Sequence, residues 1–399
     1  MDGMTDFGAG PLDGIRIIDI TNVIMGPFAT HILADMGADV IKIEAPEGDL
    51  MRNLKPYRNA GMGGAFLQLH RNKRGVMLDL KHEPALAALK RLIPTADVFV
   101  HALRPKAIDR LGLDYESVSA LRPDIVYCGA YGFSKDGPYA DKAAYDDVIQ
   151  AGSGLAALHG KRYGEPNYAP TVVCDKLAGQ AIAYSILAGL LQLERGGGGQ
   201  AIEVPMFETA IEFLTPEHYA GAVFEPPLSE FGYPRVLAKN RKPFPTADGY
   251  CCIMPYSDAN WRDFVDFIGQ PELKDDPRLE SVTTRGLNVD FLYGLIAEAA
   301  PKHSTAEWVQ FCDRSSIPSM PVLAFEDLRD NEHVKAVGLF ETVEHPSEGR
   351  HQMVRRPVNF GKAPFALRRH APRLGEHTRE VLAEAGLSEA EIEMATGES

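Results

Sequence analysis

Short runs rich in isoleucine and valine alternate with helical patterns through the first half of the chain, and this alternation constrains the fold most. Residues 15–20 (IRIIDI) and 39–44 (DVIKIE) read as strands buried on both faces. Between them, residues 28–36 read as a helix that Gly37 can end. A strand–helix–strand unit this short implies two parallel strands joined by a helical crossover.

The same alternation continues to residue 205. Further strands are predicted at residues 76–80, 97–102, 124–129 and 201–205, with helices at 84–93 and 175–195. Strands that alternate with helices form a parallel sheet covered on both faces. We therefore predict an α/β fold, with a large doubly wound, Rossmann-like domain over residues 11–205.

The second half of the chain has a different pattern. Residues 225–250 are rich in Pro, Gly and Tyr, and a strand (249–256) and three helices (261–268, 288–300, 305–312) follow. This pattern indicates a smaller α+β domain over residues 225–325. In the last segment, 330–399, residues 345–351 (HPSEGRH) read as a loop, and two short helices are predicted on either side of Gly386.

Charge and cysteine content exclude several classes of protein. The formal net charge of the 399-residue chain is -14, which argues against a nucleic-acid or anionic-membrane partner. The five cysteines form no C-x-x-C pair, so free thiols in a reducing compartment are expected. The N-terminus lacks the pattern of a signal peptide, and the apolar stretch at 181–193 is too short to span a bilayer. We expect a cytoplasmic protein.

Motifs for phosphate-binding loops and metal sites are weak. The glycines at 61–64 and 196–199 fit neither G-x-G-x-x-G nor G-K-[ST], so they are read as turns. The histidines are scattered, and His345 and His351 are read as parts of a surface loop rather than as metal ligands. No metal site is predicted.

Basic residues gather locally on this acidic chain, at 71–74 (RNKR) and at Lys81, Arg104, Lys106 and Arg110. All are predicted to lie next to the ends of strands, where open α/β sheets bind ligands. They could hold the phosphates of a nucleotide, or they could form a solvated surface. Their positions alone do not decide between these interpretations.

Asp175 begins the long apolar helix predicted at 175–195. An aspartate at a helix start is commonly an N-cap. A carboxylate that faces a cleft there could also act as a nucleophile. The residues alone leave both roles open.

Many separate motifs of the chain, in order, resemble those of the class III CoA-transferase family, also called the CaiB/BaiF or formyl-CoA transferase family. The matching runs are PLDGIRIIDIT (11–21), GPFATHILADMGADVIKIEAPEGD (26–49), RNKRGVMLDLK (71–81), RPKAIDRLGL (104–113), YGFSKDGPYAD (131–141), YDDVIQAGSGLAAL (145–158), KPFPTADGY (242–250), PELKDDPRLES (271–281), IPSMPV (317–322), EHPSEG (344–349) and RLGEHTREVLAEAGLS (373–388).

The resemblance implies an activity and an assembly. It implies an enzyme of the EC 2.8.3 type that moves CoA from an acyl-CoA thioester to a small carboxylic acid, with Asp175 as the catalytic nucleophile. It also implies an interlocked homodimer, a C-terminal segment (330–399) that returns to the large domain, and no tightly bound cofactor. CoA and acyl-CoA enter as substrates.

The resemblance also implies contacts with CoA. Leu78, Lys81, Ala107 and Arg110 match positions that contact CoA in relatives, and Arg104 matches a position that is frequently basic. These five residues are the predicted CoA-binding residues.

Three departures from the family pattern affect the details. His101-Ala102-Leu103 replaces E-N-F, and Ala45 replaces a common arginine, which weakens the carry-over of CoA contacts. No glycine-rich loop is found near residues 225–245, so formyl-CoA and oxalate are not assumed as substrates.

Three alternatives remain at this point. An α-methylacyl-CoA racemase of the same family would need a histidine where this chain has Tyr145, and tyrosine is a poor base because its phenol ordinarily titrates near pH ~10. A dinucleotide-dependent oxidoreductase would need G-x-G-x-x-G after residue 20. A non-catalytic CoA-binding protein would not need the carboxylate of Asp175.

Overall fold

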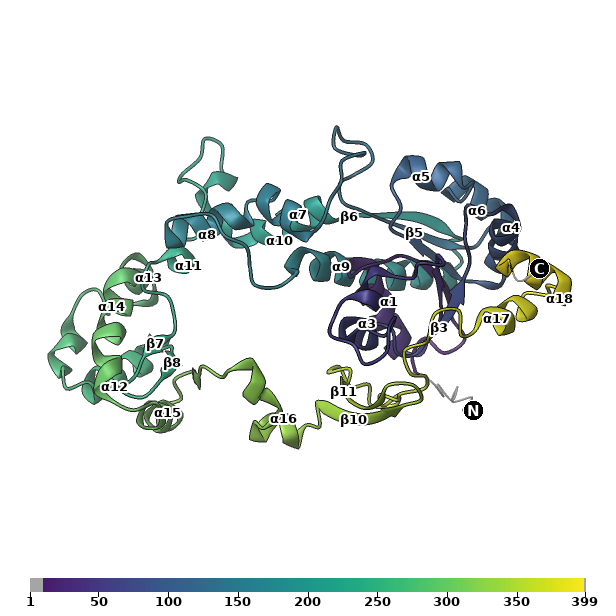
Figure 1. The fold of residues 1–399 in the computed structure, drawn as a ribbon. Helices are drawn as coiled ribbons and strands as arrows, with labels where there is room; N and C mark the ends of the chain where they lie inside the picture. Colours follow the sequence, from purple (N-terminus) through teal and green to yellow (C-terminus); the bar gives the residue numbers. More distant parts are fainter. Residues whose placement is uncertain (1–9, 398–399) are drawn as a thin grey trace, which may run out of the picture. The chain divides into compact units, whose positions relative to one another are not determined.

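The computed structural model describes residues 10–397, which form two compact units. Unit 1 comprises residues up to 153, residues 169–213 and residues from 335 onward, and unit 2 comprises residues 154–168 and 214–334. Each unit has its own hydrophobic core. We describe them separately (Figure 1).

Unit 1 is built on a six-stranded parallel sheet in the order β3-β2-β1-β4-β5-β6. The strands are β1 (Arg16–Ile20), β2 (Asp39–Glu44), β3 (Lys73–Met77), β4 (Val98–His101), β5 (Val126–Tyr131) and β6 (Gln200–Pro205). This order reverses between β1 and β4, as in doubly wound folds. The predicted α/β class and parallel sheet are therefore confirmed.

Alternate side chains of the strands enter two different cores. Ile17 packs with helices α1 (Met25–Asp35) and α9 (Val173–Glu194), whereas Ile18 packs with α4 (Glu83–Leu92) and the C-terminal helices. Because both faces of the sheet are covered, strands such as β1 and β4 carry apolar residues at successive positions rather than at every second one. This explains the isoleucine-rich runs that predicted the sheet.

The remaining helices of unit 1 lie after strand ends or at the C-terminus. They are α2 (Leu50–Asn53), α3 (Gly64–Leu69), α5 (Pro105–Arg110), α6 (Tyr115–Leu121), α7 (Asp146–Gly152), α17 (Thr378–Glu384) and α18 (Glu389–Thr396), with α10 (Met206–His218) after β6. The two C-terminal helices confirm the predicted pair, and Gly386 between them has a positive φ of 81°. Glycine adopts this left-handed conformation without the steric penalty of other residues.

Two local predictions in unit 1 were wrong. The third strand begins at Lys73, not at Val76, because internal ion pairs allow charged residues inside the sheet. The surface loop predicted over residues 345–351 is wrong in its extent, because only residues 346–348 form a turn, which joins β10 (Phe340–His345) to β11 (Gly349–Val354) in a hairpin. His345 is buried there, and its Nε2 lies 2.9 Å from the carbonyl oxygen of Ala371.

Unit 2 combines a small antiparallel sheet with several helices. The sheet has the order β7-β8-β9, from Phe244–Pro245, Tyr250–Ile253 and Ser319–Pro321. The helices are α8 (Leu155–Tyr163), α11 (Pro234–Leu237), α12 (Asp258–Phe267), α13 (Val282–Leu287), α14 (Val289–Ala299), α15 (Thr305–Arg314) and α16 (Glu332–Ala336). Aromatic rings dominate the core: Phe267 and Phe311 stack with centroids 3.9 Å apart, and Trp308 is fully buried.

Helix α9 is long and apolar enough to cross a membrane by length and composition, the only such helix in residues 10–397. One such helix is weak support for a membrane span, and eight of its residues are buried in the protein, including Ala178, Ile182 and Ile186. These residues belong to the core that lies against α1 and the sheet.

Candidate active site

Asp175 is the third residue of α9, not the residue that caps it. Val172 holds the N-cap position, and its side chain makes no capping hydrogen bond. The N-cap interpretation of Asp175 is therefore wrong. The side chain is half-buried, and no donor within residues 10–397 forms a hydrogen bond with its carboxylate. Its oxygens are thus unpaired and can meet a substrate.

Close packing of α9 against α1 holds the start of α9 in place. A Cβ at Gly179 would lie 2.7 Å from the carbonyl oxygen of Met25 and 3.0 Å from the ring of Phe28. Only glycine allows the two helices to approach this closely. The position of Asp175, one turn earlier on α9, follows from this contact.

A second carboxylate, that of Asp146, lies next to the backbone of Asp175. Asp146, the first residue of α7, is buried and accepts a hydrogen bond from the backbone N–H of Asp175 (3.0 Å). It also accepts one from Nε2 of Gln150 (2.5 Å). Burial, and secondarily the charge of Asp146, raises the pKa of Asp175 to about 6. At pH 7 roughly 90% of Asp175 is then ionised, and the carboxylate is more basic than an ordinary aspartate.

Asp146 was missed from the sequence, although it stands beside Tyr145 in the run YDDVIQ. An acidic residue in the first turn of a helix is common, because it stabilises the positive end of the helix dipole. Because this role already explains an aspartate at that position, nothing in the sequence indicated its hydrogen bond with the backbone of Asp175. Only the fold shows that a residue 29 positions away lies within hydrogen-bond distance.

Asp175 lines a cavity of about 700 Å³ in unit 1, which we call cavity A. Its other lining residues come mostly from segments that follow β1, β4 and β5. They include Asn22, Val23, Met25, Arg104, Lys106, Ala107, Arg110, Tyr131, Gly132, Lys142 and Tyr145. The cavity therefore joins one unpaired carboxylate to several cationic side chains.

A neighbouring cavity of about 480 Å³, cavity B, lies at the carboxyl ends of β1, β2 and β3. Leu78, Lys81, Ala107 and Arg110 line it, and Ala107 and Arg110 also line cavity A. Cavities in such sheets form at this edge, next to the point where the strand order reverses. All six predicted site residues thus lie in two adjoining cavities, with Arg104 and Asp175 in cavity A.

The basic run at 71–74 does not take part in this site. Arg71 pairs with Asp35 (2.5 Å), and Arg74 pairs with Asp39 (2.6 Å), both with buried guanidinium groups. Lys73 is fully buried, with its Nζ 3.0 Å from the carbonyl oxygen of Pro27. These cations hold the fold together, so they are not available to bind phosphates. The remaining four basic residues all line a cavity.

Two of the departures from the family pattern fall beside these cavities. His101 is fully buried, and burial lowers its pKa to about 4, so the ring is neutral. Its Nδ1 accepts a hydrogen bond from the backbone N–H of Leu103 (3.2 Å), which fixes the chain just before Arg104. Ala45 lines cavity B. His101 therefore has a structural role, and Ala45 leaves an apolar wall.

Other nucleophiles and metal ligands are not placed for chemistry. Burial raises the pKa of the Cys174 thiol to about 12, so it stays protonated at neutral pH. Within residues 10–397, no three His, Cys, Asp or Glu side chains are grouped so that they could hold a metal ion. Asp175 is consequently the strongest nucleophile candidate in cavity A.

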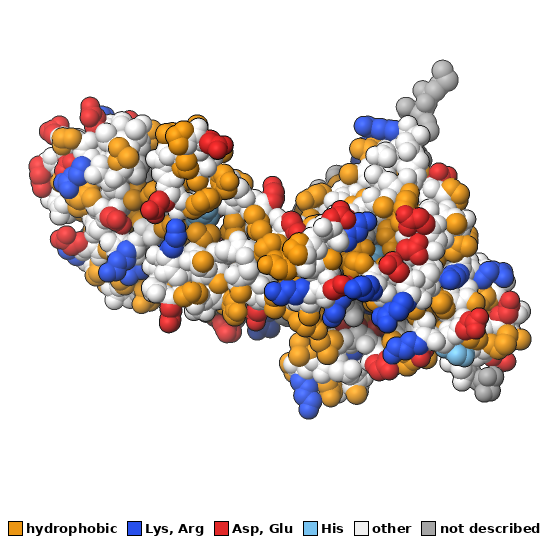
Figure 2. All heavy atoms as spheres, turned by 90° about the horizontal axis from the view of Figure 1, so that it is seen from above, with side chains coloured by type: hydrophobic (Ala, Val, Ile, Leu, Met, Phe, Trp, Pro, Cys, Tyr) orange, Lys and Arg blue, Asp and Glu red, His pale blue; other side chains and the backbone are white. Residues whose placement is uncertain are grey.

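Lysine and arginine side chains are visible close together on unit 1 in the space-filling view (Figure 2). Acidic side chains lie among them, so the basic character is local. Among the cavity residues, Lys106 pairs with Asp141 (2.5 Å) and is exposed. A local cationic surface can attract an anionic ligand even though the chain carries an overall negative charge.

Unit 1 is thus a doubly wound α/β domain with an unpaired carboxylate and several cationic side chains in cavities at the carboxyl edge of its sheet. Comparison with known families makes this specific: CoA-transferase family III matches residues 12–378, and the chain belongs to this family. It is a transferase that uses CoA thioesters as substrates.

Relatives of known name support this assignment. The chain is 31% identical to the succinate–glutarate CoA-transferase of Agrobacterium fabrum, over 94% of this chain and 95% of the relative. It is also 31% identical to a formyl-CoA:oxalate CoA-transferase of Streptomyces avermitilis, over 96% and 97% of the two chains. Among solved structures, an aspartate-to-alanine mutant of Rv3272 from Mycobacterium tuberculosis has a TM-score of 0.82 and 27% identity, covering 94% of this chain and 99% of the other.

Proposed function

We propose that this CoA-transferase moves CoA from an acyl-CoA to a carboxylic acid through covalent intermediates on Asp175. The observation that carries this proposal is the state of the Asp175 carboxylate: unpaired, half-buried beside a cationic cavity, and with a raised pKa. Such a carboxylate is mostly ionised at neutral pH and is a better nucleophile than an ordinary aspartate.

The proposed reaction has four acyl transfers. A carboxylate oxygen of Asp175 attacks the thioester carbonyl of the donor, which forms a mixed anhydride and expels CoA as a thiolate. The thiolate then attacks the side-chain carbonyl of Asp175, which releases the donor acid and leaves an aspartyl-CoA thioester. The acceptor carboxylate displaces CoA to form a second anhydride. Finally, CoA attacks the acceptor carbonyl, which yields the new acyl-CoA and restores Asp175.

The cavities supply what these steps need. We propose that Lys81, Arg104 and Arg110 pair with the phosphates of CoA, whereas Leu78 and Ala107 contact its apolar parts. Cavity B would then hold the nucleotide and cavity A the thioester end, because the two adjoin at Ala107 and Arg110. The anhydrides require exclusion of water, which a filled cavity A would provide.

Small dicarboxylic acids are the proposed substrate class. Relatives are named for succinate and glutarate, for oxalate, and for succinyl-CoA with D-citramalate, the last at 29% identity over 96% of this chain. A second carboxylate on the acid would be attracted by the cations of cavity A, such as Lys142 and Arg104. We propose succinyl-CoA as the first donor to test.

We further propose that the protein acts as a cytoplasmic homodimer. The large CoA-binding domain is assigned to residues 11–205 with the segment 330–399, and the smaller domain to residues 225–325. Large apolar side chains are exposed between residues 213 and 231, among them Phe213, Phe224 and Phe231. Exposed apolar surface of this kind supports burial in an assembly.

Isotope transfer tests the central proposal. Wild-type enzyme, succinyl-CoA and an acceptor acid labelled with ¹⁸O should give an Asp175 peptide that carries label, because an acceptor oxygen is left on Asp175 when CoA attacks the acceptor carbonyl. Asp175→Ala should lose exchange by roughly 10³-fold or more with its circular dichroism spectrum unchanged. Cys174→Ala, next to it and buried, is the matched control and should keep its activity.

Three outcomes contradict the proposal. They are label on a peptide that lacks Asp175, exchange that survives in Asp175→Ala, or direct transfer with no label on the protein. Incorporation of solvent deuterium at the carbon next to the thioester, without CoA exchange, would instead identify a racemase.

A further inference from the structure

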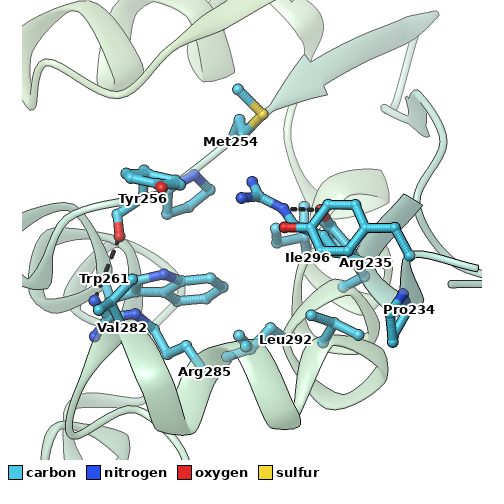
Figure 3. A pocket seen from close by; sticks show the side chains of 14 residues that line it. Pro234, Arg235, Met254, Tyr256, Trp261, Val282, Arg285, Leu292 and Ile296 are labelled. Atoms are coloured by element: carbon cyan, nitrogen blue, oxygen red, sulfur yellow. Dashed lines mark hydrogen bonds between the residues drawn. The ribbon is translucent and has the colours of Figure 1, made fainter. Parts of the chain in front are cut away.

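Unit 2 contains a pocket that shares no lining residue with cavity A (Figure 3). Its volume is about 290 Å³, close to the lower end of the range for small-molecule sites. Trp261, Leu292 and Ile296 form buried parts of its wall, whereas Tyr256 and Val282 are exposed at its edge. All residues that line it belong to unit 2.

One cation in this pocket has no carboxylate partner. Arg235 extends its guanidinium group into the pocket toward Tyr256 and Met254 (Figure 3). Its Nε donates a hydrogen bond to the hydroxyl of Tyr293 (3.3 Å), and its guanidinium carbon lies 5.2 Å from the ring centroid of Tyr256. No Asp or Glu side chain within residues 10–397 forms an ion pair with Arg235.

Arg285, the second arginine of the pocket, differs from Arg235 because it has a carboxylate partner. Arg285 is buried, and its Nη2 pairs with Asp258 (2.6 Å) while its Nη1 donates to the carbonyl oxygen of Leu279 (2.7 Å). Those contacts tie α13 to the start of α12, so Arg285 has a structural role. Arg235 has only neutral neighbours and keeps donors available for an anion.

We propose that this pocket binds a small carboxylic acid with an apolar body. The carboxylate pairs with Arg235, whose planar guanidinium can bind both oxygens. The apolar body packs on Trp261, Leu292 and Ile296, which exclude water and strengthen the ion pair. A strongly hydrated dianion without an apolar body would not fit this lining.

Intrinsic fluorescence can report binding at this pocket specifically. The chain has two tryptophans, and both lie in unit 2. Trp261 lines the pocket, whereas Trp308 is fully buried in the core and does not line it. A ligand that enters the pocket should therefore change the emission of Trp261, and neither tryptophan lines cavity A.

The probes are hexanoate and its neutral counterpart hexan-1-ol, titrated into the full-length protein. Hexanoate should change the emission saturably, and hexan-1-ol should bind at least tenfold more weakly because it cannot form the ion pair. Arg235→Gln should weaken hexanoate at least tenfold and leave hexan-1-ol unchanged.

A variant that fills the pocket and a matched control variant test whether hexanoate binds in this pocket. Gly286 lines the pocket, and a Cβ there would meet no atom within 4 Å, so Gly286→Leu should fill the pocket without a clash and abolish the response. Gly294, in the neighbouring helix α14, also has open space but does not line the pocket. Gly294→Leu should bind hexanoate as the wild type does.

The proposal is overturned by any of three results in folded protein. One is the absence of a saturable response up to roughly 10 mM hexanoate, a concentration ten times a millimolar Kd. Another is equal affinity for hexanoate and hexan-1-ol. The third is unchanged hexanoate binding in Arg235→Gln or Gly286→Leu, with melting temperatures confirming that both variants are folded.

Discussion

Replacing Asp146 by asparagine should shift the pH dependence of the enzyme. The pKa of Asp175 rises from 3.8 to about 6, a rise of about two units, and burial is a larger cause than Asp146. Asp146 therefore accounts for less than half of the rise. Neutralising it should lower the pKa of Asp175 by about 0.5–1 unit, while asparagine keeps an acceptor for the backbone N–H of Asp175.

The assay is kcat/KM for CoA exchange between pH 4.5 and pH 8. If ionised Asp175 is the nucleophile, the wild-type rate should fall at low pH with a midpoint near its pKa of about 6. At pH 5 the ionised fraction should rise from roughly 9% in the wild type to 24–50% in Asp146→Asn. Relative to its own plateau, the variant should thus be roughly three- to fivefold more active at pH 5.

Gln150→Met is the matched control for this prediction. It removes the hydrogen bond that Gln150 donates to Asp146 but leaves the negative charge of Asp146 in place. Its acid limb should not move to lower pH. An acid limb of Asp146→Asn that stays at the wild-type position, or moves upward, would refute the electrostatic reasoning.

Three further predictions concern stability. The raised pKa of Asp175 shows that its ionised form is disfavoured in the folded state. Asp175→Asn should therefore raise the free energy of unfolding at pH 7 by roughly 1–2 kcal/mol, allowing for partial solvent screening. Urea titrations below pH ~4 should show no such increase. Gly179→Leu should lower the melting temperature, because its Cβ would meet Met25, whereas Gly294→Ala should not. Glu44→Gln should cost about 3–5 kcal/mol in chemical unfolding, because it breaks the buried 2.6 Å pair with Arg52.

Prediction from the sequence succeeded where burial repeats along the chain. The run at residues 39–44 matches β2 residue for residue, because Val40 and Ile41 enter the two cores on opposite faces of the sheet and give the apolar signal of a covered strand. It failed at β3, where Lys73 and Arg74 enter the sheet. Their partners, Asp19 and Asp39, are distant in sequence, so no local pattern shows that the charges are neutralised.

The residues of the candidate site also divide into those that the sequence predicted and those that it did not. Asp175 and the five predicted CoA-binding residues were named from motifs, and the structure places all of them at two adjoining cavities. Asp146 was not named, because an acidic residue in the first turn of a helix is common and needs no functional explanation. Arg235 was not named either, since a single arginine in a Pro- and Tyr-rich segment carries no pattern.

The sequence by itself determined the parallel α/β architecture, and its resemblance to the class III CoA-transferase family implied Asp175 as the nucleophile candidate. Both the architecture and the family motifs depend on residues that are adjacent or regularly spaced, so they can be recognised along the chain. Only the tertiary structure decided which charged side chains line a cavity and which pair with other charges inside the protein. Arg74 and Arg110 look alike in sequence, yet one is buried among carboxylates and the other lines both cavities. That difference arises because Coulomb interactions and desolvation depend on distance and burial in space, and folding sets both.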